Sequence, residues 1–368
     1  MYSKDTRTVL TLDAGGQSFR FSAMRGNSEI VKSVKLIPNA ASLDHCLSTL
    51  VQGFTQVSSQ LSEPPVAISF AFPGPADYPQ GIIGDLPNFP AFKEGVPLKA
   101  FLEHEFGLPT FINNDGDLFA YGEALAGFLP YINRKLEEAG SARRYKNLIG
   151  VTLGTGFGCG VVQDGKLNVG DNAAAAEVWC MRAKNLPDCI VEDTVNSSAV
   201  IRVYRQEAGS DIDDLEVSAQ EVYEVAKGSK AGSSAAALRS FEALGNSLGD
   251  ALANILAVVD GLVVVGGGVA SAHDLFMAHA IAAINTTIGR ANGSRVPRIE
   301  LTAYNVENEQ ELSKFLQGTP RKVTAAGTGI SADYDPVKRV GVGVTKLGNL
   351  RAISVGAYSF ALRQLDKE

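Results

Sequence analysis

The chain has 368 residues, of which 45% are hydrophobic and 20% charged, a composition typical of a globular protein with about two domains. Its formal net charge of -7, from 33 basic and 40 acidic residues, argues against a general nucleic-acid binder and against binding to anionic membrane surfaces. We find no signal peptide, no apolar stretch long enough to span a bilayer and no CxxC spacing among four cysteines, so the sequence predicts a cytoplasmic protein with reduced thiols.

Strand and helix patterns alternate through the first half of the chain. Apolar or alternating runs predict strands over residues 8–12, 19–23, 29–36, 66–72 and 110–112. Apolar residues at steps of three or four predict helices over residues 43–54, 96–106 and 118–128. The proline-punctuated segment 85–92 is typical of a loop that places side chains at a site.

The second half repeats this alternation, which indicates a two-lobed α/β protein. A hairpin is predicted over residues 148–162, a buried strand over 262–265 and a further strand over 298–304. Helices are predicted within residues 190–205 and over 217–225, 235–259, 275–284, 307–315 and 352–365. Residues 319–344 carry no assignable pattern.

Two glycine-rich hairpins are the strongest local feature. The stretch Leu148–Val162, LIGVTLGTGFGCGVV, reads as strand, glycine turn and strand, with Gly154, Thr155 and Gly156 in the turn. A turn with exposed N–H groups can cradle phosphate oxygens, although ordinary hairpins also favour glycine. The stretch Thr8–Met24, TVLTLDAGGQSFRFSAM, has the same plan. Two such hairpins suggest two related lobes that face a shared phosphate.

Several carboxylates stand at positions where chemistry is possible. Asp13 ends a strand beside a glycine turn and could hold a magnesium ion, or it could simply stabilise the turn. Asp115 precedes a helix and could accept a proton during phosphoryl transfer, or it could cap that helix. Glu177 and Glu192 could bind sugar hydroxyls or be solvated surface charges. Gly266–Gly268 could admit an adenine or ribose, or form an ordinary strand-to-helix turn.

Other common catalytic motifs are absent from the sequence. There is no G-x-x-x-x-G-K-[ST] loop, no G-x-G-x-x-G after the first strand and no H-E-x-x-H. These absences leave phosphate-binding turns and placed carboxylates as the candidate chemistry.

The ordered set of motifs resembles the ROK family of sugar kinases, within the actin/hexokinase-like ATPase superfamily. The matching elements, in chain order from about Val9 to His273, are Asp13-Ala-Gly-Gly, Pro73-Gly-Pro, Pro87-Asn-Phe, Asn114-Asp115 with Glu123, Leu153-Gly-Thr-Gly-Phe-Gly-Cys-Gly, Glu177-Val-Trp-Cys, Glu192 ahead of Asn196-Ser197, and Val265-Gly-Gly-Gly. Each motif is modest, and their order makes the combination specific.

The resemblance implies a two-lobed actin-like fold of duplicated ribonuclease H-like domains with a cleft between the lobes. It implies a small lobe over residues 1–116, joined by a C-terminal helix over 350–368, and a large lobe over 117–349. Asp115 would be the catalytic base for the sugar 6-hydroxyl, with Mg²⁺ near Asp13. The hexose would be held by Asn88, Asn114, Asp115, Glu177 and Glu192. ATP would be held by Gly15, Gly16, Gly154, Thr155, Gly156, Gly266 and Gly267.

Three departures from the family pattern bear on these roles. Cys180 stands where many members carry a histidine after the glutamate, and the zinc-binding cysteine cluster is missing, so no structural zinc is expected. Gln17 stands where a threonine is usual. The segment 296–347 is longer than expected.

The resemblance thus predicts an ATP-dependent hexokinase or glucokinase. It also implies that the protein is a homodimer. The nearest alternative is the same chemistry on N-acetylglucosamine, N-acetylmannosamine, mannose or fructose. A sugar-responsive regulator would need a helix-turn-helix ahead of Val9, where the sequence predicts none. A non-catalytic sugar sensor is disfavoured because both Asp13 and Asp115 are present.

Overall fold

The computed structural model describes residues 2–14, 18–74, 76–84, 90–93, 95–209 and 216–367. The chain forms two compact units, one of residues 1–130, 160–176 and 345–368, and another of residues 131–159 and 177–344. Both are mixed α/β, as the alternating patterns predict. Among the described residues, none of the helices combines the length and apolar character that a membrane crossing requires. The predicted boundary between residues 116 and 117 stays a prediction.

The first unit is built on a sheet of strand order β3-β2-β1-β5-β9, with β4 paired to β2. Its strands are β1 (Val9–Ala14), β2 (Phe19–Arg25), β3 (Ser28–Glu29), β4 (Val34–Leu36), β5 (Ala67–Ala71) and β9 (Thr110–Asn113). β1 runs antiparallel to β2, whereas β1, β5 and β9 run parallel. A small second sheet contains β6 (Ala76–Asp77), β7 (Ile82–Ile83) and β8 (Val96–Pro97). The helices are α1 (Leu43–Ser58), η1 (Pro90–Phe92), α2 (Leu98–Phe106), α3 (Asp115–Leu125) and α11 (Asn349–Leu365).

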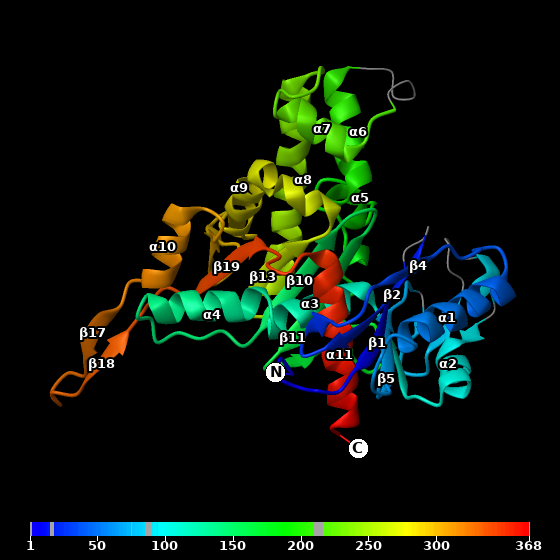
Figure 1. The fold of residues 1–368 in the computed structure, drawn as a ribbon. Helices are drawn as coiled ribbons and strands as arrows, with labels where there is room; N and C mark the ends of the chain where they lie inside the picture. Colours follow the sequence, from blue (N-terminus) through cyan, green and yellow to red (C-terminus); the bar gives the residue numbers. More distant parts are fainter. Residues whose placement is uncertain are drawn as a thin grey trace. The chain divides into compact units, whose positions relative to one another are not determined.

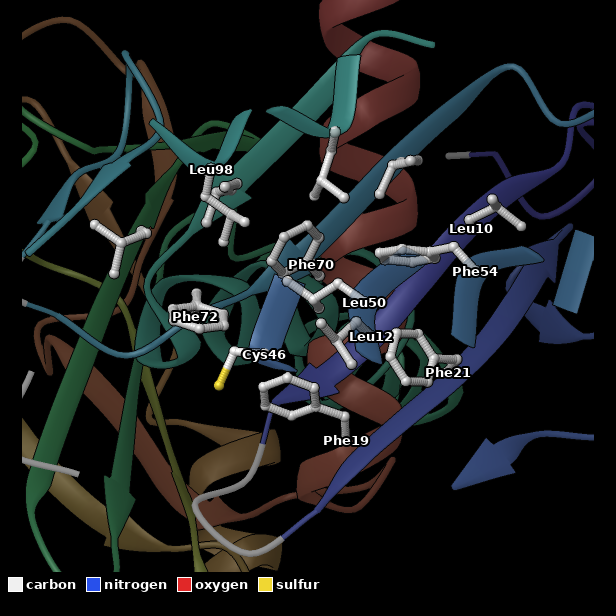
Figure 2. Packing of buried hydrophobic residues seen from close by; sticks show 14 of the residues in the cluster. Leu10, Leu12, Phe19, Phe21, Cys46, Leu50, Phe54, Phe70, Phe72 and Leu98 are labelled. Carbon is white, nitrogen blue, oxygen red and sulfur yellow. The ribbon is translucent and has the colours of Figure 1, made fainter. Parts of the chain in front are cut away.

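Aromatic side chains fill one face of this sheet. Figure 2 shows Phe19, Phe21, Phe54, Phe70 and Phe72 gathered on that face, with α11 behind the strands on the other side. Phe21 meets Phe54 edge-on at 5.1 Å between ring centroids, an arrangement that the ring quadrupoles favour. These fully buried rings hold α1 against β1, β2 and β5. The core therefore fixes the strands whose ends carry the candidate carboxylates.

The second unit is built on four parallel strands in the order β10-β13-β19-β16. The strand order continues beyond β10 with β11 and β12, of which the residues from 160 onward are counted in the first unit. The strands are β10 (Leu148–Leu153), β11 (Phe157–Gln163), β12 (Lys166–Leu167), β13 (Leu262–Gly266), β16 (Thr302–Asn305) and β19 (Arg339–Val344). The helices are α4 (Phe128–Glu138), η2 (Val178–Cys180), α5 (Glu192–Val195), α6 (Ser197–Ala208), α7 (Ala219–Ala226), α8 (Ser234–Leu256), η3 (Gly268–Ala272), α9 (His273–Ile284) and α10 (Glu309–Gln317). Two hairpins pair β14 (Thr287–Gly289) with β15 (Arg295–Pro297) and β17 (Arg321–Thr324) with β18 (Ser331–Tyr334); Figure 1 shows the second hairpin extending beyond α10.

Helices α3 and α11 cross at very short range (Figure 1). A Cβ atom at Gly122 would lie 2.0 Å from the backbone oxygen of Ala352, and one at Gly356 would lie 2.0 Å from that of Leu118. Because any larger side chain would collide with backbone, these two glycines allow the C-terminal helix to pack against α3. The predicted helix over 352–365 is confirmed and begins slightly earlier.

The carboxylate of Glu123, which is fully buried, joins the end of α3 to the segment that leads into α11. It accepts hydrogen bonds from the backbone N–H of Phe128 at 2.7 Å and of Leu347 at 3.0 Å, and from the hydroxyl of Thr345. The role of this glutamate is therefore to accept hydrogen bonds from a buried donor that follows α3 and from half-buried donors of a segment far away in the sequence.

Replacing Glu123 by alanine should lower the free energy of unfolding by about 2–5 kcal/mol, because one buried donor and two half-buried donors would lose their acceptor. Denaturant unfolding would measure this change. The exposed Glu137 on α4 provides the control, since its replacement by alanine should change stability by less than about 0.5 kcal/mol. Equal stability of both variants would contradict the structural role of Glu123.

Some predicted elements differ from the observed ones. The helix predicted over 118–128 begins at Asp115 and ends at Leu125, and α4 follows as a separate helix. The helix predicted from residue 96 begins at Leu98, since Pro97 belongs to β8 and stands at the helix N-cap. The unassigned segment 319–344 contains β17, β18 and β19. The first two of these strands are wholly exposed, so no pattern of buried residues marked them.

Candidate functional site

In the first unit, candidate polar residues meet at the carboxyl edge of the parallel strands. Asp13 is in register with Ala71 of β5, and Ala71 is in register with Asn113 of β9. Asn114 and Asp115 follow Asn113 directly, so they lie at the same edge of the sheet as Asp13. Carboxyl ends of parallel strands are the usual place for ligand sites in α/β proteins. The sequence singled out these residues, and the sheet brings them together.

Asn114, rather than Asp115, caps helix α3. The Asn114 side chain accepts a hydrogen bond from the Gly116 N–H at 2.8 Å, and its backbone is extended as an N-cap requires. Asp115 is the first residue of the helix, and its side chain is exposed, with Oδ1 2.9 Å from the same Gly116 N–H. The alternative that Asp115 serves as the helix cap is therefore wrong, and its carboxylate is available for another role.

The surrounding protein raises the pKa of Asp115, although its side chain reaches solvent. Desolvation by the protein is the largest cause, and the Gly116 N–H acts in the opposite direction. The dipole of α3 favours the ionised carboxylate, and desolvation outweighs this effect. A carboxylate with a raised pKa holds a proton more strongly, so Asp115 is a better proton acceptor than an ordinary aspartate.

Asp13 on β1 is half-buried and interacts electrostatically with the same group. Desolvation is the largest cause, and it raises the pKa of Asp13. The guanidinium of Arg20 lowers this pKa, and the negative charge of Asp115 raises it. Arg20 is opposite Asp13 in the β1–β2 pair and forms an ion pair with Glu29 at 2.8 Å. Because burial and the negative charge of Asp115 both disfavour ionisation of Asp13, a divalent cation bound near Asp13 would stabilise its carboxylate.

In the second unit, the glycine turn between β10 and β11 is held by two outside contacts. The Ser197 N–H at the start of α6 donates to the Gly154 oxygen at 2.8 Å. The Glu192 carboxylate accepts from the Phe157 N–H at 2.8 Å, so Glu192 supports the turn that contains Gly156. These contacts fix the backbone of the turn, as a binding site for phosphate oxygens requires.

The turn after β13 packs directly against the end of β10. Gly266 is in register with Thr152, and Gly267 follows with a φ of +86°. A Cβ atom at Gly267 would lie 2.2 Å from the Leu153 backbone oxygen. Glycine is therefore required at position 267. The turn at Gly154–Gly156 after β10 and the turn at Gly266–Gly268 after β13 are neighbours in space.

A cavity of about 360 Å³ opens beside these turns. It is lined by Gly154, Thr155, Ser197, Ala219, Gln220, Tyr223, Phe241, Gly268, Val269, Ser271 and Ala272. This volume lies within the range of small-molecule sites, roughly 300–1,000 Å³. The Tyr223 ring meets Phe241 edge-on at 6.2 Å between centroids, which gives the cavity an aromatic wall. The sequence singled out the glycines and Ser197, but not the lining residues from α7 and α8.

The remaining predicted residues have mixed outcomes. The half-buried Glu177 carboxylate accepts a hydrogen bond from the indole N–H of Trp179, and the exposed Cys180 thiol donates to the Glu177 backbone oxygen at 3.0 Å. Gly15, Gly16 and Asn88 lie outside the described residues. Within the described ranges, no group of three His, Cys, Asp or Glu residues is arranged to hold a metal ion.

Comparisons with known proteins agree with this architecture. The model of the ROK family matches residues 9–310. The crystal structure of a glucokinase from Parabacteroides distasonis is similar to this chain at 50% sequence identity, with a TM-score of 0.89 and coverage of 99% of both chains.

Curated relatives match over shorter stretches. A glucokinase from Thermotoga maritima is 27% identical over 54% of this chain and 60% of its own length. An N-acetyl-D-glucosamine kinase from Vibrio cholerae is 30% identical over 46% of this chain and 51% of its own length. The chain thus spans between half and two thirds of the length of these two relatives.

The two sheets, each with parallel strands that end in a glycine turn or a carboxylate, form the mixed α/β, actin-like fold that the sequence predicted. The chain belongs to the ROK family.

Proposed function

We propose that this protein is an ATP-dependent hexokinase that transfers the γ-phosphoryl group to the 6-hydroxyl of glucose. The observation that carries the proposal is Asp115, an exposed carboxylate with a raised pKa at the carboxyl end of β9, beside Asp13. The glucokinase that is 50% identical to this chain supports glucose as the acceptor. The chemistry needs a proton acceptor near the sugar hydroxyl and groups that position the phosphates.

In this mechanism Asp115 accepts the proton of the 6-hydroxyl as the oxygen attacks phosphorus. Asn114 orients Asp115 through the Gly116 N–H that both side chains share. Asn114, Glu177, Glu192 and Asn88 are proposed contacts to the hexose hydroxyls. The Glu192 oxygen that holds the Phe157 N–H is already engaged, so the other carboxylate oxygen would face the sugar.

The cavity of the second unit is the proposed site for the adenosine part of ATP. Gly154 and Thr155 line it, and the N–H groups of this turn and of Gly156 would bind phosphate oxygens. Gly266 and Gly267 bring the β13 turn close to the same place. Gly15 and Gly16 would complete the phosphate contacts.

Mg²⁺ is the metal proposed to accompany ATP, with Asp13 as its protein ligand, directly or through water. Oxygen ligands suit Mg²⁺, and the raised pKa of Asp13 fits a carboxylate that gains from a nearby cation. The ion would offset the negative charge of the phosphates when bound. A homodimer in the cytoplasm stays an expectation of the family resemblance.

A second candidate is the same reaction on another sugar. The N-acetyl-D-glucosamine kinase that is 30% identical favours an amino sugar, and Cys180 stands where a family histidine would be expected. Both candidates use the same base and differ in the residues around Glu177 and Trp179.

A coupled ADP-release assay with MgATP and a panel of hexoses would test the proposal. Turnover on glucose is expected. Turnover restricted to N-acetylglucosamine would keep the mechanism and change the acceptor. Sugar binding, followed by Trp179 fluorescence, without turnover on any sugar would overturn the kinase proposal.

Replacing Tyr223 by alanine should raise the KM for ATP about tenfold with little change in kcat, because the aromatic wall of the proposed adenosine cavity would be lost. Initial rates at varied ATP would measure this. Tyr334, which is 47% exposed on β18, provides the control, and its replacement by alanine should leave the KM unchanged. An unchanged KM in both variants would place the nucleotide elsewhere.

A further inference from the structure

A second cavity of about 360 Å³ lies at the opposite ends of the parallel strands of the second unit. It is lined by Arg143, Arg144, Tyr145, Lys146, Asn147, Asp260, Leu301, Lys338 and Arg339. These residues stand at or just before the first residues of β10, β13, β16 and β19. The cavity therefore lies at the amino ends of four strands, whereas the glycine turns lie at the carboxyl ends.

The lining of this cavity is basic, although the protein carries a net charge of -7. Arg143, Arg144 and Lys338 contribute cationic side chains, and Asp260 is the carboxylate among the lining residues. The nearest carboxylate oxygen of Glu300 is 3.6 Å from Lys338 Nζ, and 90% of the Glu300 side chain is exposed, so this pair offsets little of the charge. A concentration of positive charge on an acidic protein attracts multivalent anions.

The charge of Arg339 does not add to the positive charge that the cavity offers to an anion. Its side chain is buried, and the carboxylate of Asp335 and the backbone oxygen of Phe315 bind its guanidinium. Arg339 therefore forms a rigid floor for the cavity, and the arginines of the 143–147 segment together with Lys338 form its charged walls.

The segment that carries the two arginines is held in place by Tyr145. The Asn133 amide of α4 exchanges two hydrogen bonds of 2.8 Å with the Tyr145 backbone. The Tyr145 hydroxyl donates to the Arg339 oxygen at 2.6 Å, and its ring stacks on Phe315 at 5.7 Å between centroids. Because the backbone is already ordered, an anion would bind without a large cost for ordering this segment.

We propose that this cavity is a binding site for a small phosphate-bearing anion, at the end of the strands opposite to the glycine turns of the same unit. Arginine presents a planar set of donors that matches phosphate oxygens in pairs, and lysine adds a point charge. The volume suits a small metabolite rather than a bare monovalent ion. This proposal does not depend on the proposed kinase activity.

Calorimetric titration with pyrophosphate at constant ionic strength would test the site. The full-length protein should bind pyrophosphate with a saturable isotherm, and the double variant Arg143→Gln with Lys338→Gln should bind it at least about tenfold more weakly. The single variant Arg144→Gln, which alters an exposed side chain, should weaken binding several-fold and guards against a folding defect in the double variant.

The exposed basic pair Arg321 and Lys322 on β17 provides the matched control. The variant Arg321→Gln with Lys322→Gln removes the same number of charges outside the cavity and should bind pyrophosphate as the wild type does. The proposal is overturned if the cavity variants keep wild-type affinity. It is also overturned if the β17 variant loses as much affinity, because the effect would then reflect net charge alone.

Discussion

The variant Asp115→Asn should lower kcat on glucose by about 10²–10⁴-fold, the range that a positioned general base contributes. Asparagine keeps the shape of the side chain and can accept the Gly116 N–H as the aspartate does, so the start of α3 should be preserved. What is lost is the ability to accept the proton of the sugar hydroxyl. The coupled ADP-release assay measures kcat, and denaturant unfolding checks that the variant remains folded.

Asp44 provides the matched control, since it is an exposed carboxylate in the first turn of α1 in the same unit. Asp44→Asn should retain wild-type turnover. The raised pKa of Asp115 also sets the direction of the pH profile: activity requires the ionised form and falls as pH drops through that pKa. The loss should begin at a higher pH than an ordinary aspartate, with a pKa of about 3.9, would give. Near-normal turnover by Asp115→Asn would remove this residue from the mechanism.

Much of the site could be predicted because its signals are local. Asp13 and Asn114-Asp115 each stand at the end of a short apolar run, and the carboxyl ends of parallel strands bring such positions to one edge. The turns at Gly154–Gly156 and Gly266–Gly268 were visible for the same reason. Helices with a continuous apolar face, such as α8, were also recovered closely.

Other features depend on contacts between distant segments, which a pattern along the chain does not reveal. Glu123 reads as one more helical glutamate, and the donors at Phe128 and Leu347 give it a structural role. Glu192 reads as a sugar contact, and the fold adds its hydrogen bond to Phe157. The sequence alone does not show which residue caps α3. The contacts of the Gly116 N–H and the extended backbone of Asn114 show that Asn114 is the cap and that the Asp115 carboxylate is available.

The cavity proposed for the nucleotide could be predicted only in part. Gly154 and Gly268 belong to recognisable turns, whereas Gln220 and Tyr223 come from α7, a short helix with no motif of its own. Their place in the wall follows from the packing of α7 against α8 and η3. Residues that only line a cavity carry no spacing constraint, so sequence reasoning found the turns and missed the wall.

The variant Gly267→Ala should lower the free energy of unfolding by about 2–6 kcal/mol. Two costs add. The backbone at φ +86° and ψ 171° is in a region that residues with a Cβ atom rarely adopt, and the new methyl group would lie 2.2 Å from the Leu153 oxygen. Any relaxation must separate the β13 turn from the end of β10, so ATP affinity should fall together with stability. Denaturant unfolding and the KM for ATP measure the two effects.

The neighbouring Gly268 offers a sharp control for the steric part of this argument. A Cβ atom there meets nothing within 4 Å, and the residue has no positive φ, so Gly268→Ala should change stability by less than about 0.5 kcal/mol. Because Gly268 lines the cavity, its variant is compared by unfolding and not by the KM for ATP. If Gly267→Ala were as stable as Gly268→Ala, the close contact between the two glycine turns would not be a requirement of the fold. If only the substitution at position 267 lowers the free energy of unfolding strongly, the structure of the proposed ATP site depends on the backbone contact between Gly267 and Leu153.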